Sequence, residues 1–255
     1  MIRSRRRWLR RLGLWVAVLA CLAAPAGAKD EATLPPRPED LVRQMSALLE
    51  ATKAFSFHAE INYDDLVRDE FMVQYAGALD VSVRRPDRLR VDYRDDLSAK
   101  RLWYQRDTMT LLDRGHNVYS VAKVPSQLDP ALDEFAQKYG VSVPLGDLLF
   151  EDPDQVLLAD LRQAMWVGLN DVDGDPCHHL VFLKENVDVQ LWLEPGERRL
   201  PRKLVVTYKN LPGAPQYVAN LMDWDLSPKL PESDFTPVTA DATKVDFLEI
   251  EEARR

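Results

Sequence analysis

The sequence has little cysteine, since only Cys21 and Cys177 occur among its 255 residues. Cys21 lies in an N-terminal segment that we expect to be removed, as argued below. The remaining chain then has one cysteine and no internal disulfide, even in an oxidising compartment. Stability must therefore come from packing, and a chain of this length can bury one large core within a single domain.

Glycine is also scarce, with 10 residues in the whole chain. The sequence has no glycine-rich phosphate loop, no G-x-S-x-G nucleophile turn and no H-E-x-x-H zinc motif. Acid pairs do occur, at Asp64-Asp65 and Asp95-Asp96, but both fall in predicted turns, where solvated charge is the ordinary interpretation. We therefore expect a protein that is not an enzyme and that uses no cofactor.

A hydrophobic run long enough to cross a bilayer is missing as well. Residues 1–11 carry six arginines and no acid, and Leu12 to Ala24 form an apolar run. That run has about 13 residues, whereas a spanning helix needs roughly 20. It ends in the small residues Ala26-Gly27-Ala28, so residues 1–28 are interpreted as a signal peptide that is cleaved after Ala28. Cleavage leaves no transmembrane anchor and predicts a periplasmic protein.

Three alternatives stay open for this segment. It could be retained as an anchor, although the polar Lys29-Asp30-Glu31 follows at once. Cys21 could be a lipoprotein acylation site, although the preceding Leu19-Ala20 fits that signal poorly. Ser4 to Arg10 resembles a twin-arginine signal, which would mean export after folding. The sequence does not decide between the general and the twin-arginine routes.

Removal of the signal peptide makes the remaining chain strongly acidic. Residues 1–28 hold six of the 33 basic residues and none of the 41 acidic ones, which leaves 27 basic residues and a net charge of −14. A field of that sign repels phosphate groups, so neither nucleic acid nor an anionic membrane surface is an expected partner. The proline-rich residues 29–37 are interpreted as a linker, and residues 38–255 as one domain.

The spacing of apolar residues predicts where helices and strands lie. Helical spacing follows Pro38, and a helical block lies between Pro125 and Ala164, with helices predicted over Pro130–Tyr139, closed by Gly140, and over Gln155–Ala164. Apolar residues alternate with polar ones from Phe55 onward and again from Met165 onward, which predicts about a dozen strands, the last over Lys244–Ile250. The first half is expected to be a meander.

This order of elements predicts an α+β fold that is mostly antiparallel β. One helix precedes the sheet and a helical block interrupts it, so these helices need a sheet face to cover. A large curved antiparallel sheet with helices packed into its concave side satisfies both requirements.

Several motifs resemble a known family. The residues Phe57-His58-Ala59 and the pattern Gly77-x-Leu79-x-Val81-x-x-Arg85-Pro86-x-x-Leu89-x-Val91-x-Tyr93 resemble the opening of LolA-like lipoprotein carriers. The second half resembles the predicted periplasmic proteins grouped as domain of unknown function 2092, a branch of the LolA/LppX/RseB superfamily. That resemblance rests on Tyr139-Gly140, Pro144-Leu145-x-Asp147-Leu148-Leu149, Cys177-His178-His179-Leu180, Gln190-Leu191-Trp192-Leu193-Glu194, Leu200-Pro201-Arg202-Lys203-Leu204 and Pro215-Gln216-Tyr217. Together the motifs cover most of residues 40–250.

The resemblance implies an unclosed β half-barrel of about 11 to 12 strands, in which helices form a lid over an apolar cavity that accepts acyl chains. It also implies that Arg85 matches the family arginine whose hydrogen bonds hold the lid. Cavity contacts are predicted on the inward faces of two strands, at Leu89, Val91, Tyr93, Val189, Leu191 and Leu193. Taken singly, each member of the aromatic set is more typical of a core than of a ligand contact; the set is Phe71, Tyr75, Tyr93, Trp103, Trp192 and Tyr208.

Cys177-His178-His179 is the most tempting cluster for chemistry. Neighbours along a strand point to opposite faces, so only Cys177 and His179 share a face, and two ligands do not make a metal site. We therefore predict no metal, and we interpret the imidazoles as hydrogen-bonded structural groups.

These observations favour a periplasmic binding protein of the Gram-negative envelope that holds a lipid-like or other hydrophobic ligand, with lipoprotein acyl chains among the candidates. The alternative is a periplasmic sensor or assembly module that binds an envelope protein or lipoprotein and has no lipid ligand.

Overall fold

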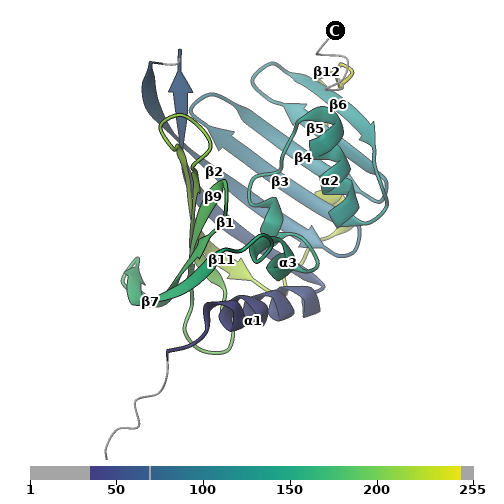
Figure 1. Cartoon of the computed structure of the whole chain (residues 1–255). Coiled ribbons are helices and arrows are strands. Elements are labelled where there is room, and N and C mark those ends of the chain that lie inside the picture. Colours follow the sequence, from purple (N-terminus) through teal and green to yellow (C-terminus); the bar gives the residue numbers. More distant parts are fainter. Residues whose placement is uncertain (1–34, 69, 248–255) are drawn as a thin grey trace, which may run out of the picture. The chain divides into compact units, whose positions relative to one another are not determined.

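The computed structural model describes residues 35–68 and 70–247, which form one 12-stranded, mostly antiparallel sheet with a few short helices. Figure 1 shows the curved sheet and its helices. The predicted signal peptide, residues 1–28, and the first six residues of the predicted linker lie outside the described residues. In the described part of the chain, no helix is long and apolar enough to span a membrane.

The helices are α1 (Pro38–Ala51), α2 (Leu128–Tyr139) and α3 (Pro153–Leu157), with short 3-10 turns η1 (Gly146–Leu148) and η2 (Glu232–Phe235). The strands are β1 (Ala54–Val67), β2 (Phe71–Arg84), β3 (Arg88–Asp95), β4 (Ala99–Gln105), β5 (Thr108–Asp113), β6 (Val118–Lys123), β7 (Gln163–Val172), β8 (Asp175–Leu183), β9 (Val187–Leu193), β10 (Pro201–Tyr208), β11 (Gln216–Asp225) and β12 (Thr243–Lys244).

The sheet consists of two meanders that meet at its centre. Its strand order is β12-β6-β5-β4-β3-β2-β1-β11-β10-β9-β8-β7. β1 pairs with β2 on one side and with β11 on the other, so that Ile61 lies opposite both Gly77 and Ala219. This seam between β1 and β11 joins the two halves. Because β7 and β12 stand at opposite ends of the order, the sheet is unclosed, and the predicted fold class is confirmed.

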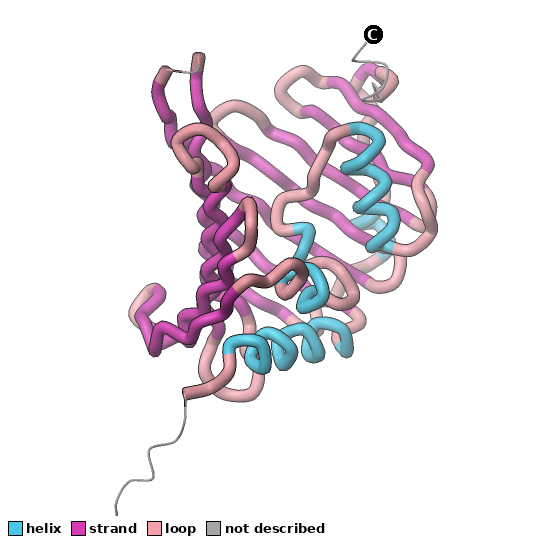
Figure 2. Tube along the Cα trace, in the orientation of Figure 1, coloured by secondary structure: helices cyan, strands magenta, loops and turns pink. Residues whose placement is uncertain are grey.

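The helices all lie on one face of the sheet, inside its curve (Figures 1 and 2). We call this the inner face. Residues alternate between the two faces along each strand, so Leu89 and Val91 of β3 are buried inward while Arg88 and Arg90 point outward. The main core joins these inward residues to the apolar sides of α1 and α2, as the sequence predicted.

Local signals position the two longer helices. Pro38 begins α1, where its fixed φ suits the first turn, and Glu39 adds an acid at the positive end of the helix dipole. α2 ends at Gly140, which has a left-handed φ of 67° and donates its N–H to Ala136. Both ends were expected from the sequence.

The predicted helix over Gln155–Ala164 is wrong beyond Leu157. α3 ends at Leu157, Asp160 adopts a left-handed φ of 52°, and Ala164 already belongs to β7. The amide of Arg162 donates to the carbonyl of Leu183 on β8, so pairing with the sheet takes these residues from the helix. Propensity for a helix here is overridden by tertiary hydrogen bonds.

The predicted last strand over Lys244–Ile250 is also largely wrong. Only Thr243 and Lys244 form β12, which runs parallel to β6. Phe247 instead packs against rings of α2, with centroids 5.3 Å from Phe135 and 4.8 Å from Tyr139. Residues 248–250 lie outside the described residues.

Asp64 and Asp65 do not lie in a turn, contrary to the prediction. β1 and β2 pair along 14 residues each, so the hairpin continues past both acids to Val67. Asp64 accepts hydrogen bonds from Gln74 Nε2 at 3.1 Å and from the amide of Gln216 at 3.0 Å. It therefore fastens the hairpin to the start of β11.

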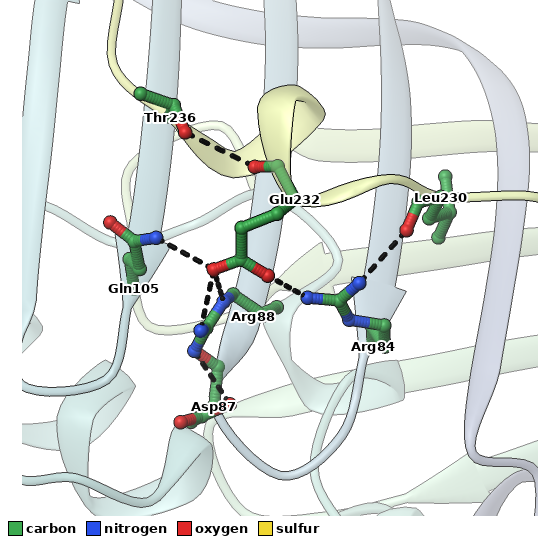
Figure 3. Close-up of polar contacts among 7 residues, drawn as sticks. All are labelled: Arg84, Asp87, Arg88, Gln105, Leu230, Glu232 and Thr236. Atoms are coloured by element: carbon green, nitrogen blue, oxygen red, sulfur yellow. Dashed lines mark hydrogen bonds and ion pairs between the residues drawn. The ribbon is translucent and has the colours of Figure 1, made fainter.

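A segment after β11, residues 226–242, anchors on the outer face of the sheet; we call it the C-terminal strap. Its residue Glu232 accepts hydrogen bonds from Arg88 and Gln105 and pairs with Arg84, as Figure 3 shows. Arg88 is a nearly buried cation, with 7% of its side chain exposed. A buried charge is costly unless it is paired, and Arg88 pairs with Glu232 at 2.6 Å and with Asp87 at 2.7 Å.

Candidate ligand-binding groove

Three hollows adjoin one another on the inner face, with volumes of about 230, 440 and 420 Å³. Tyr93 lines the first and second hollows, Tyr208 and Tyr217 line the second and third, and the segment Ser142–Pro144 lines the first and third. Because neighbouring hollows share walls, we treat them as one groove. Small-molecule sites in proteins commonly fall between about 300 and 1,000 Å³.

The first hollow lies between β3, β4 and β5 and the segment that follows α2. Its apolar wall consists of Val91, Leu102, Leu111, Val141 and Val143. Four polar residues complete it: Asp95, Ser98, Lys100 and Ser142. The first hollow therefore combines an apolar wall with these four polar residues.

The third hollow lies between α3 and the strands of the second meander. Its apolar wall includes Val156, Leu157, Val187, Val189, Leu204 and Val206. Lys184 also lines it and donates from Nζ to the carbonyl of Val156 at 2.9 Å. Burial lowers the pKa of Lys184, and the charge of Asp147 opposes that shift.

Asp95 is the best-connected acid of the groove. Its Oδ2 accepts hydrogen bonds from the hydroxyls of Tyr63 at 2.8 Å and Tyr93 at 2.6 Å, and its Oδ1 accepts from the amides of Leu97 and Ser98 and from the Ser98 hydroxyl. Burial would raise the pKa of Asp95, but these hydrogen bonds outweigh it and lower the pKa. The interpretation of Asp95 as a solvated turn charge is therefore wrong.

The tyrosines are held as neutral phenols. Burial, together with the hydrogen bond to Asp95, raises the pKa of Tyr63 to about 12. Tyr217 differs, because its hydroxyl is buried and has no hydrogen-bond partner among the described residues. Burial raises its pKa as well. A buried hydroxyl without a partner is uncommon, since it loses the hydrogen bonds it would make with water.

The structure places the six predicted cavity residues on the inner face but in two different settings. Leu89, Leu191 and Leu193 are fully buried in the packed core. Val91 and Tyr93 line the first hollow and Val189 lines the third. That these residues contact a ligand stays a prediction, and only the second group borders open space.

Arg85 lies between β2 and the chain segment that precedes α3. Its Nη2 donates to the carbonyl of Phe150 at 2.8 Å, and its guanidinium lies 5.7 Å from the ring centroid of Phe55. Its Nε is buried without a partner among the described residues, and burial lowers the pKa of the group. The lid-holding role of Arg85 stays a prediction. The hydrogen bond to Phe150 is the contact through which Arg85 would act.

Cys177 and His179 lie on one face of β8 and His178 lies on the other, as alternation along a strand requires. Cys177 is fully buried, His178 accepts a hydrogen bond from Trp166 Nε1 at 3.2 Å, and His179 stacks on Trp192 with ring centroids 4.0 Å apart. Both nitrogens of His179 lie within 3.0 Å of side-chain oxygens, on Asn170 and Gln190. In the described part of the chain, no group of three or more His, Cys, Asp or Glu residues could hold a metal ion.

Sequence reasoning missed several residues of the groove. Val141 to Pro144 have no regular secondary structure, so periodicity carries no signal there. Lys100 could have been found, because it alternates with Leu102 and Tyr104, whose inward positions the pattern predicts. A lysine in register with inward apolar residues is a signal for a polar group inside the groove.

The sheet, the helices on its inner face and the groove define an unclosed antiparallel half-barrel with a groove inside its curve. The family described as "Predicted periplasmic protein (DUF2092)" matches residues 39–248, and the chain belongs to this family. The predicted membership is thereby confirmed. None of the curated proteins matches the chain significantly.

Several solved structures are similar to this one. The LolA superfamily protein NE2245 from Nitrosomonas europaea is 11% identical, with 80% of this chain and 99% of that chain covered and a TM-score of 0.39. The lipoprotein LppX from Mycobacterium tuberculosis is 11% identical, with 76% and 98% covered and a TM-score of 0.45. The MucA/MucB complex from Pseudomonas aeruginosa gives 12% identity, 82% and 63% coverage and a TM-score of 0.41.

Proposed function

We propose that this protein is exported to the periplasm, loses residues 1–28 by cleavage after Ala28, and holds a lipid-like or other hydrophobic ligand in the groove. The observation that carries the proposal is the continuity of three hollows along the inner face. Lipoprotein acyl chains are among the candidate ligands. No catalytic step is required.

Burial of apolar surface supplies the driving force. Moving apolar area out of water contributes about 25 cal/mol per Å², and valine and leucine side chains form most of the apolar wall of the first and third hollows. The charge of Asp95 does not oppose an apolar ligand strongly, because five donors already surround its carboxylate.

The first experiment is organic-solvent extraction of the purified mature protein, followed by mass spectrometry of the extract and of the intact native protein. We expect a stoichiometric apolar species that is lost on denaturation. Protein purified from a periplasmic fraction without any bound apolar species, and unable to take up an apolar fluorescent probe, would contradict the proposal. The intact mass also tests cleavage, since the mature chain should begin at Lys29.

A matched pair of substitutions tests the position of the ligand. Leu111 lines the first hollow, whereas its neighbour Leu112 belongs to neither apolar cluster and faces outward. Leu111→Trp should reduce uptake of an apolar probe at least tenfold by filling the hollow, while Leu112→Trp should leave uptake unchanged. Circular dichroism and thermal melting check that both variants fold. Equal probe uptake by the two variants would show that the ligand does not occupy the first hollow.

The second candidate function is binding of an envelope protein or lipoprotein without a lipid ligand. The observation that favours it is β7, an edge strand on which Met165, Val167 and Leu169 are 39%, 52% and 54% exposed. An edge strand presents unpaired backbone groups to which an extended chain can add. A photo-crosslinking residue at Val167 should then give a discrete adduct in the periplasm. The same residue at Val238, which is 67% exposed in the C-terminal strap and lies outside any strand, is the control.

A further inference from the structure

We propose that the ligand of the groove is a single-chain amphiphile with an anionic head group, and that the ammonium group of Lys100 binds this head. The proposal rests on the proposed function and names the class of its ligand. It commits to a head-to-tail direction, with the head in the first hollow and the chain extending toward the third.

The position of Lys100 is set by the register of β4. It pairs with Tyr93 of β3 and shares the inward side of β4 with Leu102 and Tyr104. It lines the first hollow together with Leu102 and Leu111. Lys100 is thus an inward-facing cation next to the apolar Leu102 and opposite Asp113 of β5, where a polar group is expected only if something pairs with it.

Nothing in the described part of the chain pairs with this ammonium group. No hydrogen bond or ion pair joins Lys100 to residues 35–68 or 70–247, although its side chain is only partly exposed. Asp95 lines the same hollow, but its two oxygens accept hydrogen bonds from Tyr63, Tyr93 and the turn at Leu97 and Ser98. Asp113 lies opposite Lys100 on β5, but its oxygens contact the amides of Gly115 and His116 and the His116 ring. Both acids are therefore occupied, and the cation stays open to a ligand anion.

Ser142 supplies a second donor in the first hollow. It lines the first hollow, and its hydroxyl has no hydrogen-bond partner among the described residues. A carboxylate or phosphate oxygen held by Lys100 can accept a second hydrogen bond from this hydroxyl. Hydrogen bonds to ionised groups are shorter and stronger than neutral ones, so this pair favours an anion over an alcohol.

The lysine at the other end of the groove is a weaker site for an anion. Lys184 already donates to the carbonyl of Val156, and the negative charge of Asp147 acts on it. Val189, Leu204 and Val206 form the sheet side of the third hollow, which Ser142, Tyr208 and Tyr217 also line. The cation available to an anion is therefore at Lys100, and the sheet side toward β9 and β10 is apolar, which fits one chain with one charged end.

The test compares three probes that share a twelve-carbon chain, namely dodecanoate, dodecanol and dodecylamine, titrated calorimetrically at pH 7.5 below their aggregation concentrations. We expect dodecanoate to bind roughly tenfold more tightly than dodecanol. Lys100→Ala should remove this difference and leave dodecanol affinity within twofold, and Lys100→Arg should restore most of it. Lys229→Ala, a substitution of an exposed lysine that does not line the groove, is the matched control.

The outcomes separate the two proposals. Equal affinity for dodecanoate and dodecanol, or an unchanged preference in Lys100→Ala, overturns the anionic head group and leaves the groove as a hydrophobic site. Tighter binding of dodecylamine also overturns it and points to Asp95 as the head-group site. Absence of binding for all three probes contradicts the proposed function itself.

Discussion

Glu232 of the C-terminal strap accepts two hydrogen bonds from Arg88 of β3, from Nε at 2.9 Å and from Nη2 at 2.6 Å. The two residues are far apart in the sequence, and the contact fixes the strap to the outer face of the sheet. Gln105 adds a third hydrogen bond at 2.8 Å. This carboxylate therefore links β3 and β4 to the last described part of the chain.

The contact predicts how stability depends on pH. Hydrogen bonds from Arg88, Gln105 and Arg84 lower the pKa of Glu232 to about 2, from an ordinary value of 4.5. Because the folded pKa is depressed, the stabilisation is present above pH 4.5 and is lost as the pH falls toward 2. Glu232→Gln should lower the melting temperature at pH 7, and the difference from wild type should shrink between pH 5 and pH 2. A difference in melting temperature that stays constant across this range would mean that the substitution acts through packing and not through loss of the carboxylate charge.

Two tyrosines with buried hydroxyls should respond differently when the hydroxyl is removed. The hydroxyl of Tyr104 donates to the carbonyl of Pro125 at 2.9 Å, whereas that of Tyr217 has no partner among the described residues. Tyr104→Phe should lower the free energy of unfolding by about 1 kcal/mol, and Tyr217→Phe should leave it unchanged or raise it by up to about 1 kcal/mol. Urea unfolding measures both. A loss of stability in Tyr217→Phe would reveal a partner such as a bound water.

Gly77 is predicted to be required by close backbone approach. A Cβ atom at this position would lie 2.7 Å from the carbonyl oxygen of Arg94 on the neighbouring strand. Gly77→Ala should therefore lower the free energy of unfolding by roughly 1–3 kcal/mol, because the backbone must shift. Gly115→Ala is the control, since its Cβ would lie 3.4 Å from the side-chain oxygen of Asp113. Similar stability of the two variants would show that β2 and β3 separate easily.

Arg85 is predicted to hold the segment before α3. Loss of its hydrogen bond to Phe150 should let η1 and α3 open more often, because a hydrogen bond from a charged donor contributes about 1.5–3 kcal/mol. In Arg85→Gln, the amides of Leu148 and Leu149 should exchange with deuterium at least tenfold faster. Arg84→Gln removes the neighbouring arginine, which contacts the strap, and should leave these amides unchanged. Equal protection of these two amides from exchange in both variants would show that Arg85 does not hold the segment before α3.

The sheet was predictable because its signal is local. Alternation along β3 places Leu89 and Val91 inward, and the start of α1 follows from Pro38. The same signal failed at Ala164, because a short apolar stretch suits a helix or a strand and only its pairing with β8 decides.

The groove was much harder to predict than the sheet. Its roof, Val141 to Pro144, has no periodicity, and its position depends on packing between elements distant in sequence. The role of Asp95 was missed for the same reason: one of its donors, Tyr63, comes from β1, a strand that is not adjacent to β3. A single sequence shows which side chains face inward, but the space left between them depends on tertiary contacts.

The seam between β1 and β11 has a consequence for folding. Ile61 pairs with Ala219, 158 positions later, so the central contact of the sheet closes a very long loop. Such non-local pairing forms slowly, because closing the loop costs conformational entropy before the paired strands gain any favourable contacts. We expect pulsed hydrogen exchange to show the β1–β2 hairpin protected before the β1–β11 seam. Until β11 has emerged, the N-terminal meander exposes the unpaired side of β1, so this half of the nascent protein is the part that most needs a chaperone.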